Sequence, residues 1–442
     1  MTRLNEELRD VHPARQGLAV GLAIGATVPG LLMRFLGLES AHALEALFYG
    51  LAIVGAAFLL SWAAEVAQLD ISAGLAIALL AFMAVLPEYA VDMVFAFKGG
   101  NQVALYDESC HPPGASGEDA CSLALANMTG ANRLLIGLGW SLVVFIAWYR
   151  TRDRGANRTT DVRLERSHSV EVSYLAIATV YSLTLPLKSA ITPFDAVVLV
   201  GIFVAYTVRI SRAPAEEPHL VGPARLIGTF RTPRRRAAVI AMFLFSAAAI
   251  LLCAENFAEA LVQTGEEFGI SQFLLVQWLA PLASEAPELL IAGLYAWRLN
   301  TNAGLGTLVS SKVNQWTLLV GTLPIVFSIG LGHLGGLPID AHQRGELLLT
   351  AAQSFFALAV LVTLSISTRE ALMLFGLFWA QFIIGALVPE SAAGVERTAV
   401  AIVYLVLGVG IFVRNRGLIR PLLRDGFRTS YKDLSRAEAV GE

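Results

Sequence analysis

Two Pro-Glu pairs are the residues of this chain best placed to do chemistry inside apolar segments. Pro87-Glu88 and Pro287-Glu288 lie 200 residues apart, each within a long apolar run. A carboxyl group inside a membrane segment is costly, so it marks an ion pathway by default. Proline also frees a backbone carbonyl one turn earlier. Carboxylate and carbonyl oxygens suit a hard cation such as calcium. The alternative is a structural ion pair at each glutamate, which the duplication disfavours.

Membrane helices must position these glutamates. The 442 residues are 56% hydrophobic and only 15% charged, with a mean hydropathy of +0.63, which excludes a chain built of soluble cores. Continuous apolar runs of about 20 residues cross a hydrocarbon core of roughly 30 Å as helices. The sequence therefore predicts an all-α polytopic membrane protein with about twelve transmembrane helices. Their expected ranges are 16–37, 45–69, 71–98, 122–149, 170–187, 189–211, 237–262, 268–297, 304–332, 346–366, 370–389 and 397–415.

The two Pro-Glu pairs also predict an internal repeat. When Glu88 is set on Glu288, five predicted helices of each half align, and one extra helix remains at each end. An odd number of spans inserts the two copies with opposite orientation, as in the inverted repeats of secondary transporters. The expected divisions are 1–44 (N-terminal tail and extra helix), 45–211 (first repeat), 212–236 (cytoplasmic linker), 237–389 (second repeat) and 390–442 (extra helix and basic cytoplasmic tail).

Basic segments indicate how the chain is oriented in the membrane, which we expect to be the cell inner membrane. Arginines gather in 150–166, in 209–236 and after residue 414, which predicts that both termini are cytoplasmic. Topology and anionic lipid explain these segments better than nucleic acid does. The loop 99–121 is then outside, where Cys110 and Cys121 could form a disulfide or remain two unpaired thiols. Cys253 is expected to be an inert apolar residue.

A helix with amide and hydroxyl side chains follows each Pro-Glu helix. The first carries Asn127 and Asn132, and the second carries Thr307 and Ser311. Small and polar residues at such spacing are common in ordinary helix packing. Their place directly after both Pro-Glu helices favours a role in completing the shell of an ion.

These residues resemble the two alpha-repeats of the calcium/cation antiporter superfamily, which includes the sodium/calcium exchangers. The family pattern is Gly-Thr-Ser-x-Pro-Glu on one helix and Gly-Asn-x-x-Gly-Ser-Asn-x-x-Asn on the next. The resemblance implies a secondary active antiporter that moves calcium in exchange for sodium or protons, by alternating access around Glu88 and Glu288. It further implies supporting ion ligands at Asn127, Asn132, Ser284, Thr307 and Ser311.

The chain departs from this pattern in both repeats. Ala84 and Val85 stand at the hydroxyl positions of the first repeat, while Glu285 replaces a serine and Lys312 an asparagine in the second. A buried lysine needs a carboxylate partner, so we predict an ion pair between Glu285 and Lys312. Lys312 would then act as a tethered monovalent cation. An alternative function follows, a monovalent cation/proton antiporter in which Lys312 replaces a bound cation.

Other functional classes find less support. The histidines lie in loops or at predicted helix ends, so a proton route would have to use buried carboxyl groups. No catalytic residue set or nucleotide loop is evident, which predicts a protein that is not an enzyme and needs no cofactor. The expected partners are inorganic cations and the lipid bilayer. Interfacial positions or structural pairs are expected for Glu65, Asp92, Glu255 and Glu259.

Overall fold

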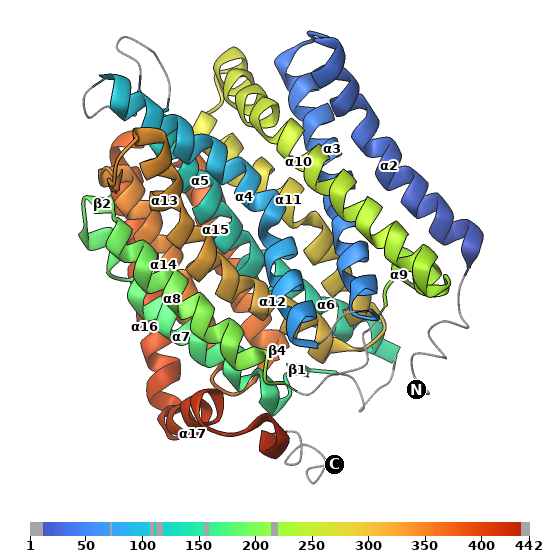
Figure 1. Cartoon of the computed structure of the whole chain (residues 1–442). Helices are drawn as coiled ribbons and strands as arrows, with labels where there is room; N and C mark the ends of the chain where they lie inside the picture. The colour runs from blue at the N-terminus through green and yellow to red at the C-terminus, as the bar shows by residue number, and fades with distance from the viewer. Residues whose placement is uncertain are drawn as a thin grey trace.

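The structure, a computed structural model, describes residues 12–70, 73–106, 110–111, 118–153, 159–213 and 220–434. Side chains are described throughout these ranges except at 73–85, 386 and 390–391. Long helices form one bundle, with α2 and α16 on opposite flanks (Figure 1). Nine helices of the described part are long and apolar enough to cross a membrane. The prediction of an all-α polytopic membrane protein is confirmed.

A helix or a pair of consecutive helices occupies each predicted span. The ends differ by several residues, because hydropathy marks the stretch in hydrocarbon whereas the helix continues beyond it; α10, predicted as 237–262, runs from Thr232 to Phe268. The spans are α2 (Pro13–Leu36), α3 (His42–Ala67), α4 (Ala73–Tyr106), α5 (Ala120–Leu134) with α6 (Ser141–Arg150), α7 (Ser169–Ser182), α8 (Pro193–Ile210), α10 (Thr232–Phe268), α11 (Gln272–Trp297), α12 (Thr301–Asn314) with α13 (Val320–Leu331), α14 (Ala341–Leu361), α15 (Thr368–Leu387) and α16 (Glu390–Arg414).

Several short elements were not predicted. Two helices, α9 (Pro223–Gly228) and α17 (Arg416–Phe427), lie outside the spans, and two 3₁₀ turns, η3 (Arg166–His168) and η4 (Leu185–Leu187), flank α7. The third span of each repeat contains a π-helical segment, η1 (Leu135–Trp140) between α5 and α6 and η5 (Gln315–Leu319) between α12 and α13. Such π segments are frequent at functional sites.

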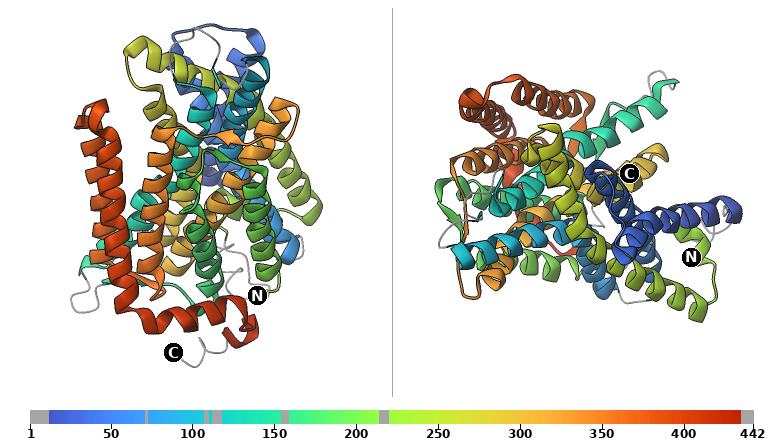
Figure 2. Two further views of the ribbon diagram at one scale, coloured as in Figure 1. Left: turned by 90° about the vertical axis from the view of Figure 1, so that its left-hand side faces the viewer. Right: turned by 90° about the horizontal axis from the view of Figure 1, so that it is seen from above.

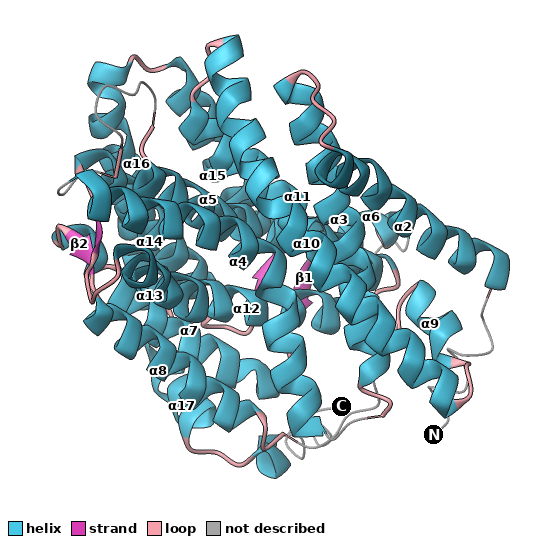
Figure 3. Cartoon of the chain, turned by 45° about the horizontal axis from the view of Figure 1, so that its top comes forward, coloured by secondary structure: helices cyan, strands magenta, loops and turns pink. Residues whose placement is uncertain are grey.

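Four short strands reveal the inverted relation of the two repeats (Figure 3). β1 (Asp161–Arg163) pairs antiparallel with β4 (Ser365–Ser367), and β2 (Ala190–Ile191) pairs antiparallel with β3 (Leu337–Pro338). In each pair, a strand before the fourth helix of one repeat meets a strand after the fourth helix of the other. Two copies related by a two-fold axis in the membrane plane produce this reciprocal exchange.

The helices that carry the Pro-Glu pairs pack in the same reciprocal way. α4 lies along α13 of the second repeat, and α11 lies along α5 of the first. Glycines permit the close approach: a Cβ at Gly130 would fall 1.7 Å from the backbone oxygen of Gln277, and one at Gly100 would fall 2.1 Å from that of Phe327. Small residues bring membrane helices together in this manner. The centre of the bundle is therefore built by both repeats (Figure 2).

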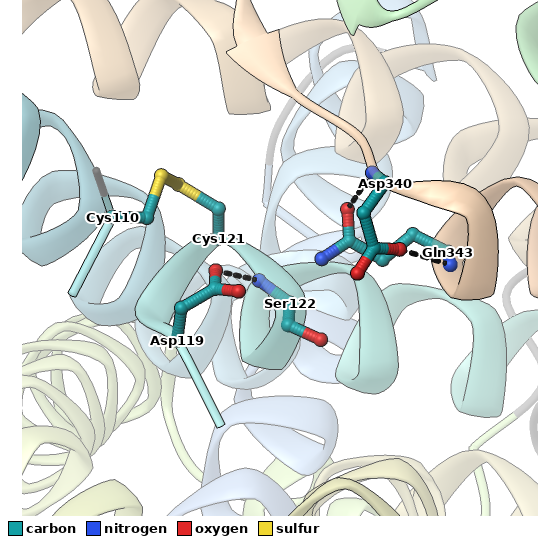
Figure 4. Close-up of a disulfide and its surroundings, with 6 residues drawn as sticks. All are labelled: Cys110, Asp119, Cys121, Ser122, Asp340 and Gln343. Carbon is teal, nitrogen blue, oxygen red and sulfur yellow. Dashed lines mark hydrogen bonds between the residues drawn. A yellow bond between two sulfur atoms is a disulfide. The ribbon is translucent and has the colours of Figure 1, made fainter. Parts of the chain in front are cut away.

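A disulfide links Cys110, four residues after the end of α4, to the first turn of α5. Cys110 and Cys121 are bonded, with their Cα atoms 5.9 Å apart. Asp119 lies beside the bond and caps α5 by accepting from the backbone N–H of Ser122 at 2.8 Å (Figure 4). Of the two alternatives for this cysteine pair, the structure forms the disulfide, while Cys253 is a buried free thiol.

Candidate cation site

Four buried carboxyl groups lie near one another inside the bundle. α4 carries Glu88 and Asp92, four residues apart, and α11 carries Glu285 and Glu288, three residues apart, so each pair lies on one face of its helix. Their residues are 1% to 9% exposed. Glu88 lies close enough to the other three to interact with them electrostatically. Both helices run through their prolines without interruption.

The side-chain amide of Gln315 bridges two of these carboxyl groups. Its Nε2 donates to Oε1 of Glu88 at 3.1 Å and to Oε1 of Glu285 at 2.5 Å. Because one amide nitrogen donates to both, the carboxyl groups of Glu88 and Glu285 lie side by side. Two buried carboxylates so close together repel each other, which favours a proton on one of them.

Several buried oxygens of the cluster remain available to a cation. The Nδ2 group of Asn127 donates to Oδ1 of Asp92 at 2.8 Å, which leaves one oxygen on each side chain. Hard divalent cations bind such a mixture of carboxylate and amide oxygens. The buried oxygens that receive no hydrogen bond from the described residues include Asp92 Oδ2, Asn127 Oδ1, Glu285 Oε2, Glu288 Oε2 and Gln315 Oε1.

Lys312 is fully buried but does not bind Glu285 directly. Its ammonium donates to the backbone oxygen of Asn132 at 2.7 Å and to Oδ1 of Asn132 at 2.6 Å. The predicted ion pair of Glu285 with Lys312 is therefore not formed among the described residues. Glu285 instead accepts from Gln315, while Lys312 finds two oxygens on the facing helix. The attraction between Lys312 and the carboxyl groups acts over a longer distance.

The remaining predicted ligands differ in position. Ser284 and Ser311 are buried, and the hydroxyl of Ser284 donates to the backbone oxygen of Pro281 at 3.3 Å. Thr307 is exposed, and its hydroxyl donates to the backbone oxygen of Ala303 at 2.9 Å. Its side chain therefore bonds its own helix and not the cluster. The side chains of Ala84 and Val85 lie outside the described residues.

Sequence reasoning missed Gln315 and placed Asp92 too near the membrane surface. Gln315 occupies the final amide position of the family pattern, which was the one available signal for it. Asp92 lies one turn beyond Glu88 on the same face, yet it stands near the end of the predicted span. The helix continues to Tyr106, so Asp92 is deep in the bundle and only 1% exposed.

A second buried charge network lies beside this site. Glu346 on α14 forms ion pairs with two arginines. Its Oε2 lies 3.1 Å from Nη1 of Arg133, and its Oε1 lies 2.6 Å from Nε of Arg397. Gln277 donates to Glu346 at 3.0 Å and lies 3.2 Å from the hydroxyl of Thr129. The network connects α5 and α11 of the cation site with α14 and with α16, the helix outside the repeats.

Comparison with known proteins fits this architecture. The family described as "Sodium/calcium exchanger protein" matches residues 41–211 and 238–385. The chain belongs to this family. Among solved structures, the crystal structure of the H⁺/Ca²⁺ exchanger CAX is 40% identical, with a TM-score of 0.83, over 96% of this chain and 99% of that chain. Native YfkE shares the fold at 14% identity and a TM-score of 0.56, over 90% of this chain and 99% of that one.

A comparison with curated proteins finds no match. Membership of the exchanger family makes the chain a multi-pass membrane antiporter of the calcium/cation type.

Proposed function

We propose that this exchanger moves calcium across the membrane in exchange for protons, by alternating access around Glu88 and Glu288. The pairing of the buried Glu88 and Glu285 carboxyl groups on the amide of Gln315 is the observation that carries this proposal. It gives the cluster a site for a proton at the place where the carboxylates would bind calcium. The 40% identical relative is named an H⁺/Ca²⁺ exchanger.

Exchange follows from competition for the same carboxyl oxygens. A divalent cation needs ionised carboxylates, so its binding to Glu88 and Glu288 releases the protons that these buried carboxyl groups hold. When the cation leaves on the other side, the buried carboxylates repel one another and take up protons again. Gln315 holds Glu88 and Glu285 together in the proton-loaded arrangement, because its amide donates to both. The site then opens to the two sides of the membrane in turn, in a proton-loaded form and in a calcium-loaded form.

Two features argue against sodium as the counter-ion. Ala84 and Val85 lack the hydroxyl oxygens of the family pattern. The ammonium of Lys312 is bound to both oxygens of Asn132, which are therefore not free for a monovalent cation. The side chain of Lys312 thus takes the place of one bound sodium ion.

Calcium-45 uptake into proteoliposomes tests the counter-ion. A pH gradient should drive uptake by the wild type, and a sodium gradient of equal size should not. Glu88→Gln and Glu288→Gln should abolish uptake, because neither amide can release a proton to make a carboxylate. Glu267→Gln, at an exposed glutamate near the end of α10, should transport like the wild type. Uptake driven by sodium alone contradicts proton coupling.

The contact of Lys312 with Asn132 also supports a second function, exchange of a monovalent cation for protons without calcium. In the same vesicles, a pH-sensitive dye should report proton movement on addition of calcium but not of sodium or potassium. Proton movement with sodium or potassium, and none with calcium, would favour this second function.

We further propose that both termini are cytoplasmic. The start of α2, the β1–β4 pair and α17 lie toward one end of the bundle (Figure 1). Arginines concentrate at that end, which is the arrangement that membrane insertion favours on the cytoplasmic side. This orientation can be tested with single cysteines introduced at Arg231 and at Leu334. Intact cells are treated with a membrane-impermeant reagent that labels cysteine. Only the cysteine at position 334 should react.

A further inference from the structure

α17 presents a row of arginines on a helix that lies outside the membrane spans. A single residue separates it from α16, and it runs across the end of the bundle at a steep angle to α16 (Figure 2). Its exposed basic residues recur every four positions and therefore follow one side of the helix. They are Arg416, Arg420, Arg424 and, directly after the last helical residue, Arg428. Among the described residues, Arg416, Arg420 and Arg428 have no ion-pair partner.

The opposite side of α17 is fixed to the transporter. Leu422, Asp425 and Gly426 are buried against it. Arg166 donates to Oδ2 of Asp425 at 2.7 Å, and Arg209 donates to the backbone oxygen of Gly426 at 3.1 Å. Burial alone would raise the pKa of Asp425, but the hydrogen bonds from Arg166 and Thr429 and the charges of Arg166 and Arg424 together more than offset it, so the pKa lies below its usual value. The arginine row therefore sits on a rigid support.

We propose that this arginine row binds the headgroups of anionic phospholipids. α17 follows directly on a transmembrane helix, so it lies at the level of the headgroups. Guanidinium groups bind phosphate through paired hydrogen bonds, and basic clusters on an amphipathic helix beside a span bind anionic lipid. Leu418 and Phe427, 46% and 37% exposed, add apolar contact area on the same helix.

The support links the lipid to the ion pathway. α17 packs against α7, and α7 packs against α12 and η5, the elements that carry Lys312 and Gln315. A lipid held at α17 is thus one helix away from the cation site. This connection is independent of which ion drives transport.

Native mass spectrometry of the purified full-length protein in a neutral detergent tests the proposal. Phosphatidylglycerol and phosphatidylcholine are titrated onto the wild type and onto Arg416→Gln/Arg420→Gln/Arg428→Gln. A matched variant, Arg15→Gln/Arg231→Gln/Arg234→Gln, removes the same charge from exposed arginines at the same end of the bundle. Because three arginines are removed from one surface, the α17 variant should bind phosphatidylglycerol at least about tenfold more weakly.

The matched variant should bind phosphatidylglycerol like the wild type, and phosphatidylcholine should bind weakly to all three proteins. Equal loss in both triple variants would show a nonspecific charge effect and overturn the proposal. Binding of a polyglutamate peptide, but not of phosphatidylglycerol, through the α17 arginines would assign the surface to an acidic protein segment and also overturn it. The single variant Arg420→Gln, with a smaller loss, keeps the test valid if the triple variant folds poorly.

Discussion

The ammonium of Lys312 is bound by Asn132, the residue at the same position of the other repeat. Each stands three residues before the π segment of its span, and the two are joined by hydrogen bonds of 2.7 and 2.6 Å. In an inverted repeat, residues at matching positions can meet at the two-fold axis. A symmetric site would place two amides there. This chain instead places a lysine side chain against one amide.

Replacing Lys312 by asparagine should create sensitivity to sodium. Lys312→Asn restores the family residue, frees both oxygens of Asn132 and adds a third amide oxygen for a monovalent cation. A sodium gradient should then drive calcium-45 uptake severalfold above the wild-type level in proteoliposomes.

Lys312→Met is the matched control for this experiment, because methionine keeps the length of the side chain but supplies neither charge nor oxygen. It should remain insensitive to sodium. If Lys312→Asn transports calcium and is as insensitive as Lys312→Met, the lysine does not take the place of a bound sodium ion.

Gln315 should be as important for transport as a direct cation ligand. Gln315→Leu removes both hydrogen bonds that hold Glu88 and Glu285 together. A hydrogen bond to a charged group contributes about 1.5–3 kcal/mol, so transport efficiency should fall by about ten- to a hundredfold. Initial rates of calcium uptake over a range of calcium concentrations measure the change. Gln353→Leu, at a buried glutamine of α14 outside the carboxyl cluster, should change these rates less than threefold.

The sequence predicts the parts of this structure that follow from residue type and order. Continuous apolar runs locate the spans, since a membrane helix must be apolar along its length. The duplicated Pro-Glu pairs locate the halves, and the odd number of spans between them requires opposite insertion. Glu88 and Glu288 are therefore predictable from the cost of burying a carboxyl group.

Contacts that depend on the rotation of a helix are harder to predict. The π segments change the rotation of the third span in each repeat, and no residue pattern marked them. As a result, the partner of Lys312 was predicted on the wrong helix and Gln315 was overlooked. α17 was also missed. It is an amphipathic helix, with polar and apolar residues on different sides, and it is too short and too charged to span a membrane.

The buried network around Glu346 should be a major contribution to stability. Arg133 and Glu346 are 1% and 4% exposed, so Glu346→Gln leaves a buried guanidinium without its counter-charge. Such a loss typically costs about 3–5 kcal/mol. Unfolding of the purified protein in mixed micelles should show a decrease of this size.

The double variant Arg133→Met/Glu346→Gln should recover more than half of that loss, because both charges are then removed. Glu259→Gln breaks a half-exposed pair with Lys98 and should cost less than about 1 kcal/mol. If Glu346→Gln destabilises the protein no more than Glu259→Gln does, the network contributes little to the fold.

Asp70 should make stability depend on pH below about pH 4. It joins the end of α3 to the start of α10, accepting from Nε and Nη2 of Arg235, both at 2.8 Å. These hydrogen bonds lower the pKa of Asp70 below its usual value of about 3.9. A lowered pKa in the folded state adds stability above the unfolded-state pKa, and that stability is lost as the pH falls through the folded-state pKa.

Asp70→Asn should therefore be less stable than the wild type by about 1 kcal/mol at pH 7, with a difference that shrinks below about pH 4. Thermal unfolding between pH 7 and pH 3 measures this difference, and Asp153→Asn, at an aspartate side chain 91% exposed, should follow the wild type throughout. A difference between wild type and Asp70→Asn that stays constant over this range would show that the pairing with Arg235 is not the source of the stability.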